Sequence, residues 1–306
     1  MIHYFFKSLN DNEFIKSEEI RLHSWIHAFE ASIEDLDKIM ELTHIDFADL
    51  KDALDKYEIP RVEHEGANIL IFTRHPAEQE LGLYTVTLTI LLTPQYLVTI
   101  SPHTSGVVDQ ILTSSLRVTT EQTSKLLFHI LLRITQEFNI NIKRVRAIVL
   151  EQEKQLSDID SVAIVNLTKS EEILNQYLTS LVPMRNLLEA ISSGRFVHLY
   201  ENDLDLLQDL TIAIRQSEDL CNVNIKSIQS LRDSYQIIFT NDVNKTIKRL
   251  TAIMIIFTIP MILFSFYGMN VVLPLSNNPW AFIVLLNLGI IGIIASIIIF
   301  LRKKWL

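Results

Sequence analysis

The chain has 306 residues, of which 48% are hydrophobic, and its 36 Asp and Glu residues outnumber its 27 Lys and Arg residues. All 36 acidic residues but only 24 of the basic ones lie within residues 1–249, which therefore carry a net charge of −12, whereas residues 250–301 contain no Asp, Glu, Lys or Arg. Because roughly 20 apolar residues cross a bilayer once, this uncharged run excludes a fully soluble protein, and the acidic remainder excludes a basic nucleic-acid-binding protein.

Residues 1–120 combine short strand patterns with short helical patterns, and we predict that they form a cytoplasmic α/β domain. Five segments rich in β-branched and aromatic residues are the expected strands: residues 2–6, 24–28, 68–73, 83–91 and 96–101. Ser32 followed by Asp35 predicts the start of a helix that ends near Leu42, and Asp46 is expected to begin another that ends before Pro60. The first residues lack the basic and long apolar segments of a secretory signal, so we expect the domain to remain in the cytoplasm.

Residues 121–203 are expected to form long amphipathic helices. Apolar residues recur every three or four positions from Leu126 to Val149, and this stretch contains no Gly or Pro. A second helix is predicted over about residues 161–190, with an interruption near Pro183 and a break at Gly194.

A stalk helix is predicted over residues 204–249, where apolar residues keep a regular helical rhythm without Gly or Pro. If this helix continues into the membrane and ends at Gly268, its roughly 65 residues at about 1.5 Å each make a rod of about 100 Å. Such a rod suggests a rigid connection between a cytoplasmic body and a membrane span.

Residues 250–306 are predicted to form a transmembrane hairpin with spans over about residues 250–268 and 280–301. Lys245, Lys248 and Arg249 precede the first span, and residues 302–304 after the second span are all basic. The positive-inside rule places both basic clusters in the cytoplasm, so we expect both termini to be cytoplasmic and the uncharged loop of residues 271–279 to be outside.

Several residues within the hairpin have expected packing roles. Gly289, Gly292 and Ser296 place small side chains on one face of the second span, which suits close helix packing. Pro260 removes a backbone donor from the first span and is expected to bend it locally. The aromatic residues expected at the membrane surfaces are Tyr267, Trp280 and Trp305.

The first span closes with the sequence Tyr267-Gly268-Met269-Asn270. In a purely structural interpretation, Gly268 caps the helix in the left-handed conformation and Asn270 is a polar turn residue at the membrane surface. From these residues alone, a functional interpretation is equally open.

These features together resemble the CorA magnesium-transporter family. The resemblance rests on Gly268-Met269-Asn270 at the end of the penultimate span, on the second span close behind it, on the long leading helix and on the basic C-terminal residues. Three further segments are similar to that family: Trp25-Ile26-His27, Pro60-Arg61-Val62-Glu63 and Asn244-Lys245-Thr246. The resemblance covers the whole chain and implies a CorA-like fold, with an α/β cytoplasmic domain, a long helical stalk and two transmembrane helices.

The resemblance implies a channel-like homopentamer that carries Mg²⁺, with Co²⁺ as a further candidate. It assigns Tyr267, Gly268, Met269 and Asn270 to a selectivity filter at the end of the first span. Mg²⁺ loses its water shell reluctantly, and a ring of Asn270 carboxamides offers oxygens that accept hydrogen bonds from those waters. Because one hairpin cannot enclose a water path, transport requires an oligomer on physical grounds as well.

A stripe of residues on the first span is expected to line the pore by the same resemblance. Its members recur at helical spacing and are Asn244, Ile247, Leu250 (or Thr251), Met254 and Thr258. Ile247, Leu250 and Met254 would form an apolar constriction that closes by dewetting. The alternative is that the stripe is an ordinary helix-packing face.

Two stalk acids match family positions. Asp233 falls at a pore-entrance acid, and Asp209 at an acid of a cytoplasmic divalent-cation site between subunits, where it would act as a regulatory metal ligand. Carboxylates that repel one another across an interface are held together when a divalent cation bridges them, so internal Mg²⁺ would close the ring. For each Asp, a solvated helix face is the alternative.

Other readings stay open or lack support. The loop after Asn270 has no acidic residue, so Asn277 and Asn278 offer only neutral oxygens there. A separate alternative is that the same fold carries another divalent ion, Zn²⁺ or Ni²⁺. His23 and His27 can share a strand face and His64 lies between two Glu residues, but no third ligand follows at metal-site spacing. With only 7 Gly and no phosphate-binding loop, we do not expect an enzyme. We also expect no cofactor beyond Mg²⁺ as substrate and regulator. The acidic charge gives no reason to expect a nucleic-acid partner.

A membrane-tethered structural or signalling protein is the remaining alternative. In that case the hairpin is only an anchor, and substitution of Asn270 or Gly268 by Ala would be tolerated. A transporter of the expected type would lose uptake with its fold intact.

Overall fold

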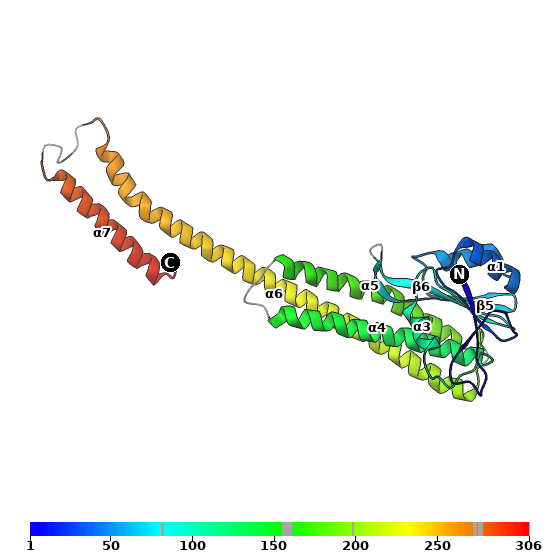
Figure 1. Ribbon diagram of the computed structural model, residues 1–306. Helices are drawn as coiled ribbons and strands as arrows, with labels where there is room; N and C mark the ends of the chain where they lie inside the picture. The colour runs from blue at the N-terminus through cyan, green and yellow to red at the C-terminus, as the bar shows by residue number, and fades with distance from the viewer. Residues whose placement is uncertain (81–82, 155–160, 198, 272–273, 275–277, 306) are drawn as a thin grey trace. The chain divides into compact units, whose positions relative to one another are not determined.

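A computed structural model describes residues 1–80, 83–154, 161–197, 199–271, 274 and 278–305 of the chain (Figure 1). The contacts divide the chain into two compact units, Met1–Leu231 and Arg232–Leu306.

The first unit contains a mixed seven-stranded sheet with the strand order β2-β1-β3-β7-β6-β5-β4. Strands β3 and β7 are parallel, and the other neighbouring pairs are antiparallel. The strands are β1 (Ile2–Phe6), β2 (Ile15–Ser17), β3 (Trp25–Ala28), β4 (Arg61–Glu65), β5 (Asn68–Glu80), β6 (Leu83–Leu92) and β7 (Leu97–Ile100).

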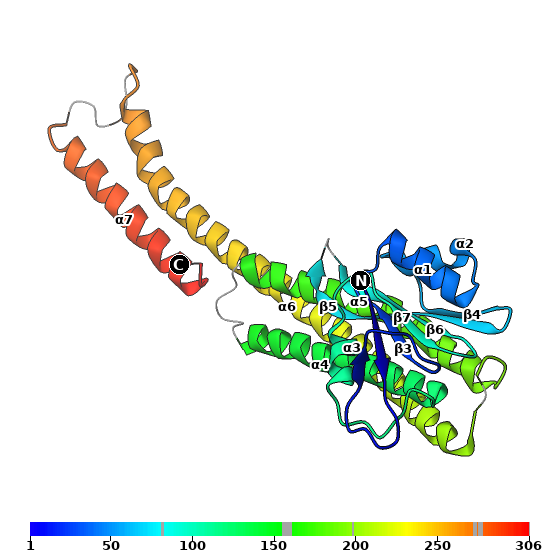
Figure 2. The same cartoon turned by 45° about the vertical axis from the view of Figure 1, so that its right-hand side comes forward.

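One face of the sheet is covered by α1 (Ile33–Thr43) and α2 (Phe47–Leu50), and α2 continues as a short 3-10 helix, η1 (Lys51–Leu54) (Figure 2). The predicted cap is confirmed: the Ser32 hydroxyl accepts from the Asp35 N–H at 3.3 Å, and the Asp35 carboxylate accepts from the Ser32 N–H at 3.1 Å. This reciprocal pair satisfies two donors that the first helical turn leaves open.

Helix α2 begins at a second predicted cap, since the Asp46 carboxylate accepts from the Ala48 N–H. The helices bury alternate strand residues in a continuous apolar core. Its fully buried members are Ile26, Ala28, Leu36, Ile39, Ile45, Leu50, Ala53, Leu70, Phe72, Leu91, Val98 and Ile100.

The opposite face of the sheet is covered by α3 (Gly106–Leu112) and α4 (Thr123–Lys154), and α5 (Ser161–Ser192) also packs against β4, β5 and β6 (Figures 1 and 2). Every residue of β6 from 84 to 92 is buried, which is the pattern of a central strand covered on both faces. The core of this unit therefore has two layers, with the sheet between them.

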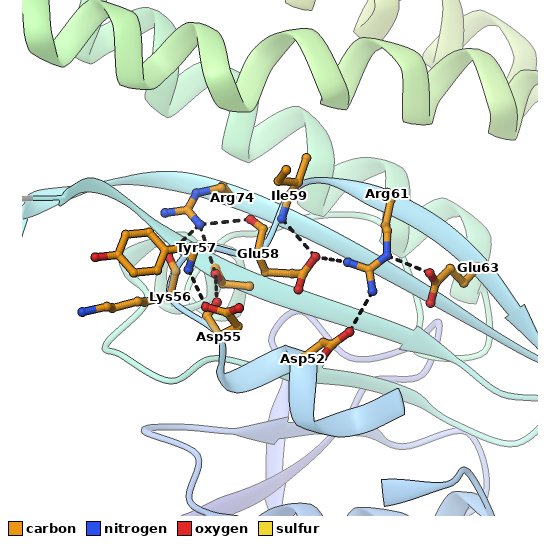
Figure 3. Close-up of polar contacts among 10 residues, drawn as sticks. Asp52, Asp55, Lys56, Tyr57, Glu58, Ile59, Arg61, Glu63 and Arg74 are labelled. Atoms are coloured by element: carbon orange, nitrogen blue, oxygen red, sulfur yellow. Dashed lines mark hydrogen bonds and ion pairs between the residues drawn. The ribbon is translucent and has the colours of Figure 1, made fainter. Parts of the chain in front are cut away.

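The loop between η1 and β4 is held by two arginines (Figure 3). Arg74, only 6% exposed, donates to the carbonyl oxygens of Lys56 at 2.7 Å and Glu58 at 3.0 Å. Arg61 lies over the Phe72 ring and forms ion pairs with three carboxylates, those of Asp52, Glu58 and Glu63. Through Arg61, the Pro60-Arg61-Val62-Glu63 segment thus links the edge strand β4 to the preceding loop and to Phe72 of β5.

Three elements were not predicted from the sequence: β2, β4 and α3. The predicted interruption of the second long helix is wrong, because α5 runs through Pro183 without a break. Leu181 and Met184 beside the proline are completely buried, so tertiary packing holds the helix although Pro183 cannot donate its backbone hydrogen bond. The left-handed break at Gly194 is present, with φ of 70°.

The longest element is α6 (Glu201–Tyr267), whose 67 residues form one helix as predicted, and α7 (Ala281–Arg302) follows it. Within the second unit, α7 runs back along the final part of α6 in an antiparallel hairpin (Figure 1). Both helices are long and apolar enough to cross a membrane, and their apolar windows are almost entirely exposed.

Candidate functional site

The contact between α6 and α7 is made by the small residues of α7. A β-carbon at Gly289 would lie 3.7 Å from Pro260 Cβ, and one at Gly292 would lie 2.9 Å from Ile259 Cγ2. Ser296, one turn further along, is 7% exposed and donates its hydroxyl proton to the Gly292 carbonyl oxygen. The predicted small-residue face of the second span is therefore confirmed as its packing face.

The expected pore stripe of α6 lies away from this contact. Successive helical residues are about 100° apart around the axis, so Met254 is about 160° from the completely buried Ala252 and about 140° from Ile259. Ile247, Leu250 and Met254 are 55%, 56% and 53% exposed, and Asn244 and Thr258 are exposed as well. In one chain, the apolar and polar side chains of the stripe are therefore exposed.

Tyr267 is the last residue of α6, and its hydroxyl donates to the Pro274 carbonyl oxygen at 2.9 Å. The Gly268 N–H is shared between the carbonyl oxygens of Phe264 at 3.0 Å and Ser265 at 3.2 Å, a bifurcated bond typical of helix ends. The Met269 N–H then donates to Phe266 at 3.3 Å. These bonds extend the helical winding past Tyr267 and carry the chain to Asn270.

Gly268 does not adopt the left-handed conformation that the purely structural interpretation gave it. Among the described glycines only Gly66 and Gly194 have positive φ, and a β-carbon at position 268 would meet two carbonyl oxygens at 3.5 Å, an ordinary contact. The backbone of one chain therefore does not require glycine here. Asn270 is exposed, and of the loop amides only Asn278 is described, where its side chain accepts from the Trp280 N–H; Asn277 lies outside the described residues.

Asp209 and Asp233 both lie on exposed positions of α6. Asp233 lines a shallow open groove together with Gln236, Ile237, Thr240 and Asn241, so it stands at the start of a groove about two helical turns long. Within the part of the chain that the structure describes, no group of three or more His, Cys, Asp or Glu side chains is placed to hold a metal ion.

The histidines singled out from the sequence are dispersed. His23 has φ of 62° and precedes β3, so it does not share a strand face with His27. His27 is buried, its Nδ1 lies 2.9 Å from the Thr99 hydroxyl, and burial lowers its pKa to about 4. His64 stacks on Phe196 with ring centroids 4.7 Å apart. Each of the three therefore has a structural environment of its own.

The chain is similar in sequence to a known family and to several of its members. The family model for CorA-like Mg²⁺ transporter proteins matches residues 22–303. The cobalt/magnesium transport protein CorA of Methanocaldococcus jannaschii is 27% identical over 299 residues, which cover 95% of this chain and 94% of that protein. The magnesium transport protein CorA of Campylobacter jejuni is 25% identical over 175 residues, covering 54% of this chain and 49% of that one.

A solved structure of the CorA magnesium transporter from M. jannaschii superposes with a TM-score of 0.84 and 24% identity, covering 100% of this chain and 99% of that one. The fold class expected from the sequence is thereby confirmed: an α/β domain, a long helix and two apolar C-terminal helices.

Proposed function

This chain belongs to the family of CorA-like Mg²⁺ transporter proteins, and on that premise we propose that it transports divalent metal cations across the cell membrane, Mg²⁺ first and Co²⁺ second. The observation that carries the proposal is the position of Asn270, an exposed carboxamide three residues beyond the end of the apolar helix α6. A neutral oxygen at the lip of a membrane span suits a cation that keeps its water shell.

The transporting unit is a homopentamer in which α6 lines the pore and α7 lies outside it. One hairpin cannot enclose water, so several copies must share the path. The arrangement is supported by two faces of α6: Ala252 is buried and Ile259 faces α7, whereas Met254, about 140° around the helix from Ile259, is exposed. That free face is the one that symmetry-related copies would bring together.

The filter consists of Tyr267, Gly268, Met269 and Asn270. Copies of Asn270 around the axis would accept hydrogen bonds from the waters of hydrated Mg²⁺, so the filter selects the ion with its shell by size and by the pattern of its donors. Tyr267 supports the filter from below, because its hydroxyl ties the helix end to Pro274 in the following loop. Gly268 and Met269 set the height at which the carboxamide stands.

An apolar constriction below the filter acts as the gate. Ile247, Leu250 and Met254 expose large apolar side chains in the single chain, and a ring of such side chains expels water when it narrows. Asn244 and Thr258 flank this constriction on the same face of α6 and offer polar contacts to a hydrated ion.

Cytoplasmic divalent cations regulate the gate through Asp209, and Asp233 marks the pore entrance. Because the described residues of one chain place no cluster of acidic or histidine ligands around Asp209, a bridging cation there needs a carboxylate from a neighbouring subunit. Binding would hold two subunits together, and loss of the cation would release them. Five copies of residues 1–249, each with net charge −12, would also concentrate cations at the entrance.

Both termini lie in the cytoplasm in this proposal. Lys248 and Arg249 precede the apolar part of α6 and the basic residues 302–304 follow α7, so the positive-inside rule assigns both helix ends to the same side.

The test is Mg²⁺ uptake into liposomes that contain a Mg²⁺-sensitive dye. Asn270→Ala should lower uptake by more than about tenfold, because all copies in the ring lose their water acceptor at once and each hydrogen bond contributes about 1 kcal/mol. Asn287→Ala is the matched control: it removes the same carboxamide from α7, where the side chain only donates to the Ile283 carbonyl oxygen.

Equal uptake by the Asn270→Ala and native proteins would contradict the filter. A monomeric or dimeric mass in mild detergent would contradict the pore and favour the membrane-tethered alternative. Competition by Co²⁺, Ni²⁺ and Zn²⁺ in the same assay ranks the substrates, since a ring of neutral oxygens distinguishes hydrated ions of similar size only weakly.

A further inference from the structure

The end of α7 has a specific backbone geometry that the transport proposal does not use. The Trp305 N–H donates to the Phe300 carbonyl oxygen at 3.0 Å, and the Lys304 N–H donates to Leu301 at 3.1 Å. Lys304 has φ of 55°, the left-handed conformation that usually falls to glycine. These two bonds and the positive φ define a Schellman motif, which ends the helix and folds the chain back on itself.

The fold-back places an indole ring at the end of the membrane span. The Trp305 ring stacks on Phe300 with centroids 5.6 Å apart and an interplanar angle of 21°, the apolar contact that accompanies this motif. An amphipathic ring fixed at the end of an apolar helix is typical of an anchor at the headgroup level of a bilayer. Phe300 itself is 8% exposed, so the stack is seated on the hairpin.

A group of basic side chains without ion-pair partners among the described residues lies at the same end of the hairpin as this anchor. We call it the basic belt, and its members are Lys248, Arg249, Arg302, Lys303 and Lys304. All five are exposed, and none forms an ion pair with any residue in the described part of the chain. Nearby Lys245 differs from them, because it pairs with Asp242 at 2.9 Å.

The two halves of the basic belt lie at the same depth along the hairpin. Ile259 of α6 contacts Gly292 of the antiparallel α7, and Arg249 precedes Ile259 by ten residues just as Arg302 follows Gly292 by ten. At about 1.5 Å per residue, both arginines stand about 15 Å from that contact in the same direction. Five positive charges therefore gather at one level, beside the anchoring indole.

We propose that the basic belt binds the headgroups of anionic phospholipids, with Trp305 holding it at the membrane surface. The partner is a lipid rather than a soluble anion because the charges stand at the end of two apolar spans, where headgroup phosphates lie at fixed depth. Basic residues adjacent to a span attract an anionic leaflet, and this attraction decreases with ionic strength.

Trp305 itself can report the lipid that touches it. Of the three tryptophans, Trp25 is completely buried in the sheet and Trp280 lies at the opposite end of α7, so the full-length Trp280→Phe protein leaves Trp305 as the membrane probe. The protein is reconstituted in phosphatidylcholine vesicles that contain an equal fraction of chain-brominated phosphatidylglycerol or chain-brominated phosphatidylcholine. Brominated chains quench tryptophan fluorescence on contact.

The expected result is preferential quenching by the anionic lipid, with an apparent association stronger by at least roughly fivefold, which is the contribution of a single basic side chain near an anionic surface. The preference should fall as salt rises, and the Arg302→Gln/Lys303→Gln protein should lose most of it. Lys245→Gln, which removes a lysine already paired with Asp242, should retain it.

Equal quenching by the two lipids at low salt would overturn the proposal. The salt series uses unaltered basic residues, so the test stands even if a charge variant inserts poorly. Inorganic phosphate at matched ionic strength should leave the preference unchanged, and its selective loss in phosphate would assign the belt to soluble anions instead. None of these readouts depends on cation transport.

Discussion

Gly292 of α7 lies so close to Ile259 of α6 that a β-carbon added to the glycine would stand 2.9 Å from Ile259 Cγ2. Real β-carbons do not approach another atom this closely, and Ile259 is β-branched, so its Cγ2 atom is held near the backbone and has little freedom to turn away. The close packing of α6 against α7 therefore requires glycine at position 292. Gly289, one turn earlier, has more room, with its nearest neighbours at 3.7 and 3.9 Å.

We expect Gly292→Ala to destabilise the hairpin by about 1–3 kcal/mol, the usual range for overpacking a close contact. Gly289→Ala is the matched control and should change stability little, because its new methyl group fits at ordinary contact distance. Thermal unfolding of the full-length protein in one detergent measures both. Equal melting temperatures for the two variants would contradict the close approach.

The local capping of α1 was predictable because the signal lies within four residues. Ser32 and Asp35 satisfy each other's donors whatever the rest of the chain does, so the pattern alone was sufficient. Likewise, α6 contains no Gly or Pro before Pro260, so its apolar residues recur with a helical period that the sequence shows directly. Features of this kind need no knowledge of their tertiary partners.

Strand β4 was missed because it is a charged edge strand. Its sequence Arg61–Glu65 contains only one β-branched residue, and its charges suit a strand with one unpaired side. A signal was present nearby: Gly66 begins a two-residue turn with φ of 61°, and β4 and β5 pair outward from it. At Pro183 the reverse holds, since the local rule favoured a break and buried packing overrode it.

The candidate filter illustrates a different limit of sequence reasoning. The sequence places these residues at the end of the first span, and α6 ends at Tyr267, but the left-handed backbone that the purely structural interpretation gave Gly268 is absent. The common glycine cap is a statistical preference, and in this chain the helical winding continues past Tyr267 through a hydrogen bond that the Gly268 N–H shares between the Phe264 and Ser265 carbonyl oxygens. The pore axis is a property of several chains, so neither one sequence nor one protomer contains it.

Gly268→Ala tests the filter, because the backbone of one chain does not require glycine at this position. Because the added methyl group would meet only two carbonyl oxygens at 3.5 Å, we expect folding and insertion to stay within about 0.5 kcal/mol of the native protein. In the proposed filter, five extra methyl groups would narrow the ring below Asn270, so Mg²⁺ uptake should fall sharply. Normal uptake together with normal stability would show that position 268 lies outside the filter.

The proposed gate can be tested at Leu250. Leu250→Ser replaces an apolar side chain that is 56% exposed in the single chain, so it should alter stability little while allowing water to stay in the constriction. We expect faster divalent uptake that resists closure by internal Mg²⁺. The control is Ile256→Ser, a partly exposed residue about 120° around α6 from Leu250 and about 160° from Met254, which should keep normal gating.

Thiol labelling tests which face of α6 contacts water. The native Cys221 is completely buried, and burial raises its pKa to about 12, so it should not react with a charged thiol reagent at neutral pH. We expect Thr258→Cys to react readily in reconstituted protein. Ile253→Cys lies about 140° around the helix and should react slowly in lipid, where a thiolate is disfavoured. The opposite order of rates would exclude Thr258 from a pore.

Acid should weaken the α/β unit through two buried histidines. His27 and His75 are 3% and 2% exposed, and burial lowers the pKa of each to about 4. His75 is held neutral between Pro76 and Ser105, with its Nδ1 2.9 Å from the Pro76 carbonyl oxygen and its Nε2 3.1 Å from the Ser105 hydroxyl. In the unfolded chain both rings titrate near pH 6.5.

The unfolded state therefore binds more protons than the folded state between about pH 6.5 and pH 4, so stability decreases as the pH falls through this window, by about 3 kcal/mol for each ring at its lower end. Chemical denaturation at pH 7, 6 and 5, followed by circular dichroism, measures the decrease before most carboxylates titrate. His27→Gln removes one titrating ring, so its stability should depend less steeply on pH than that of the native protein. Parallel pH curves for the two proteins would mean that His27 is protonated in the folded state, against its burial beside Thr99.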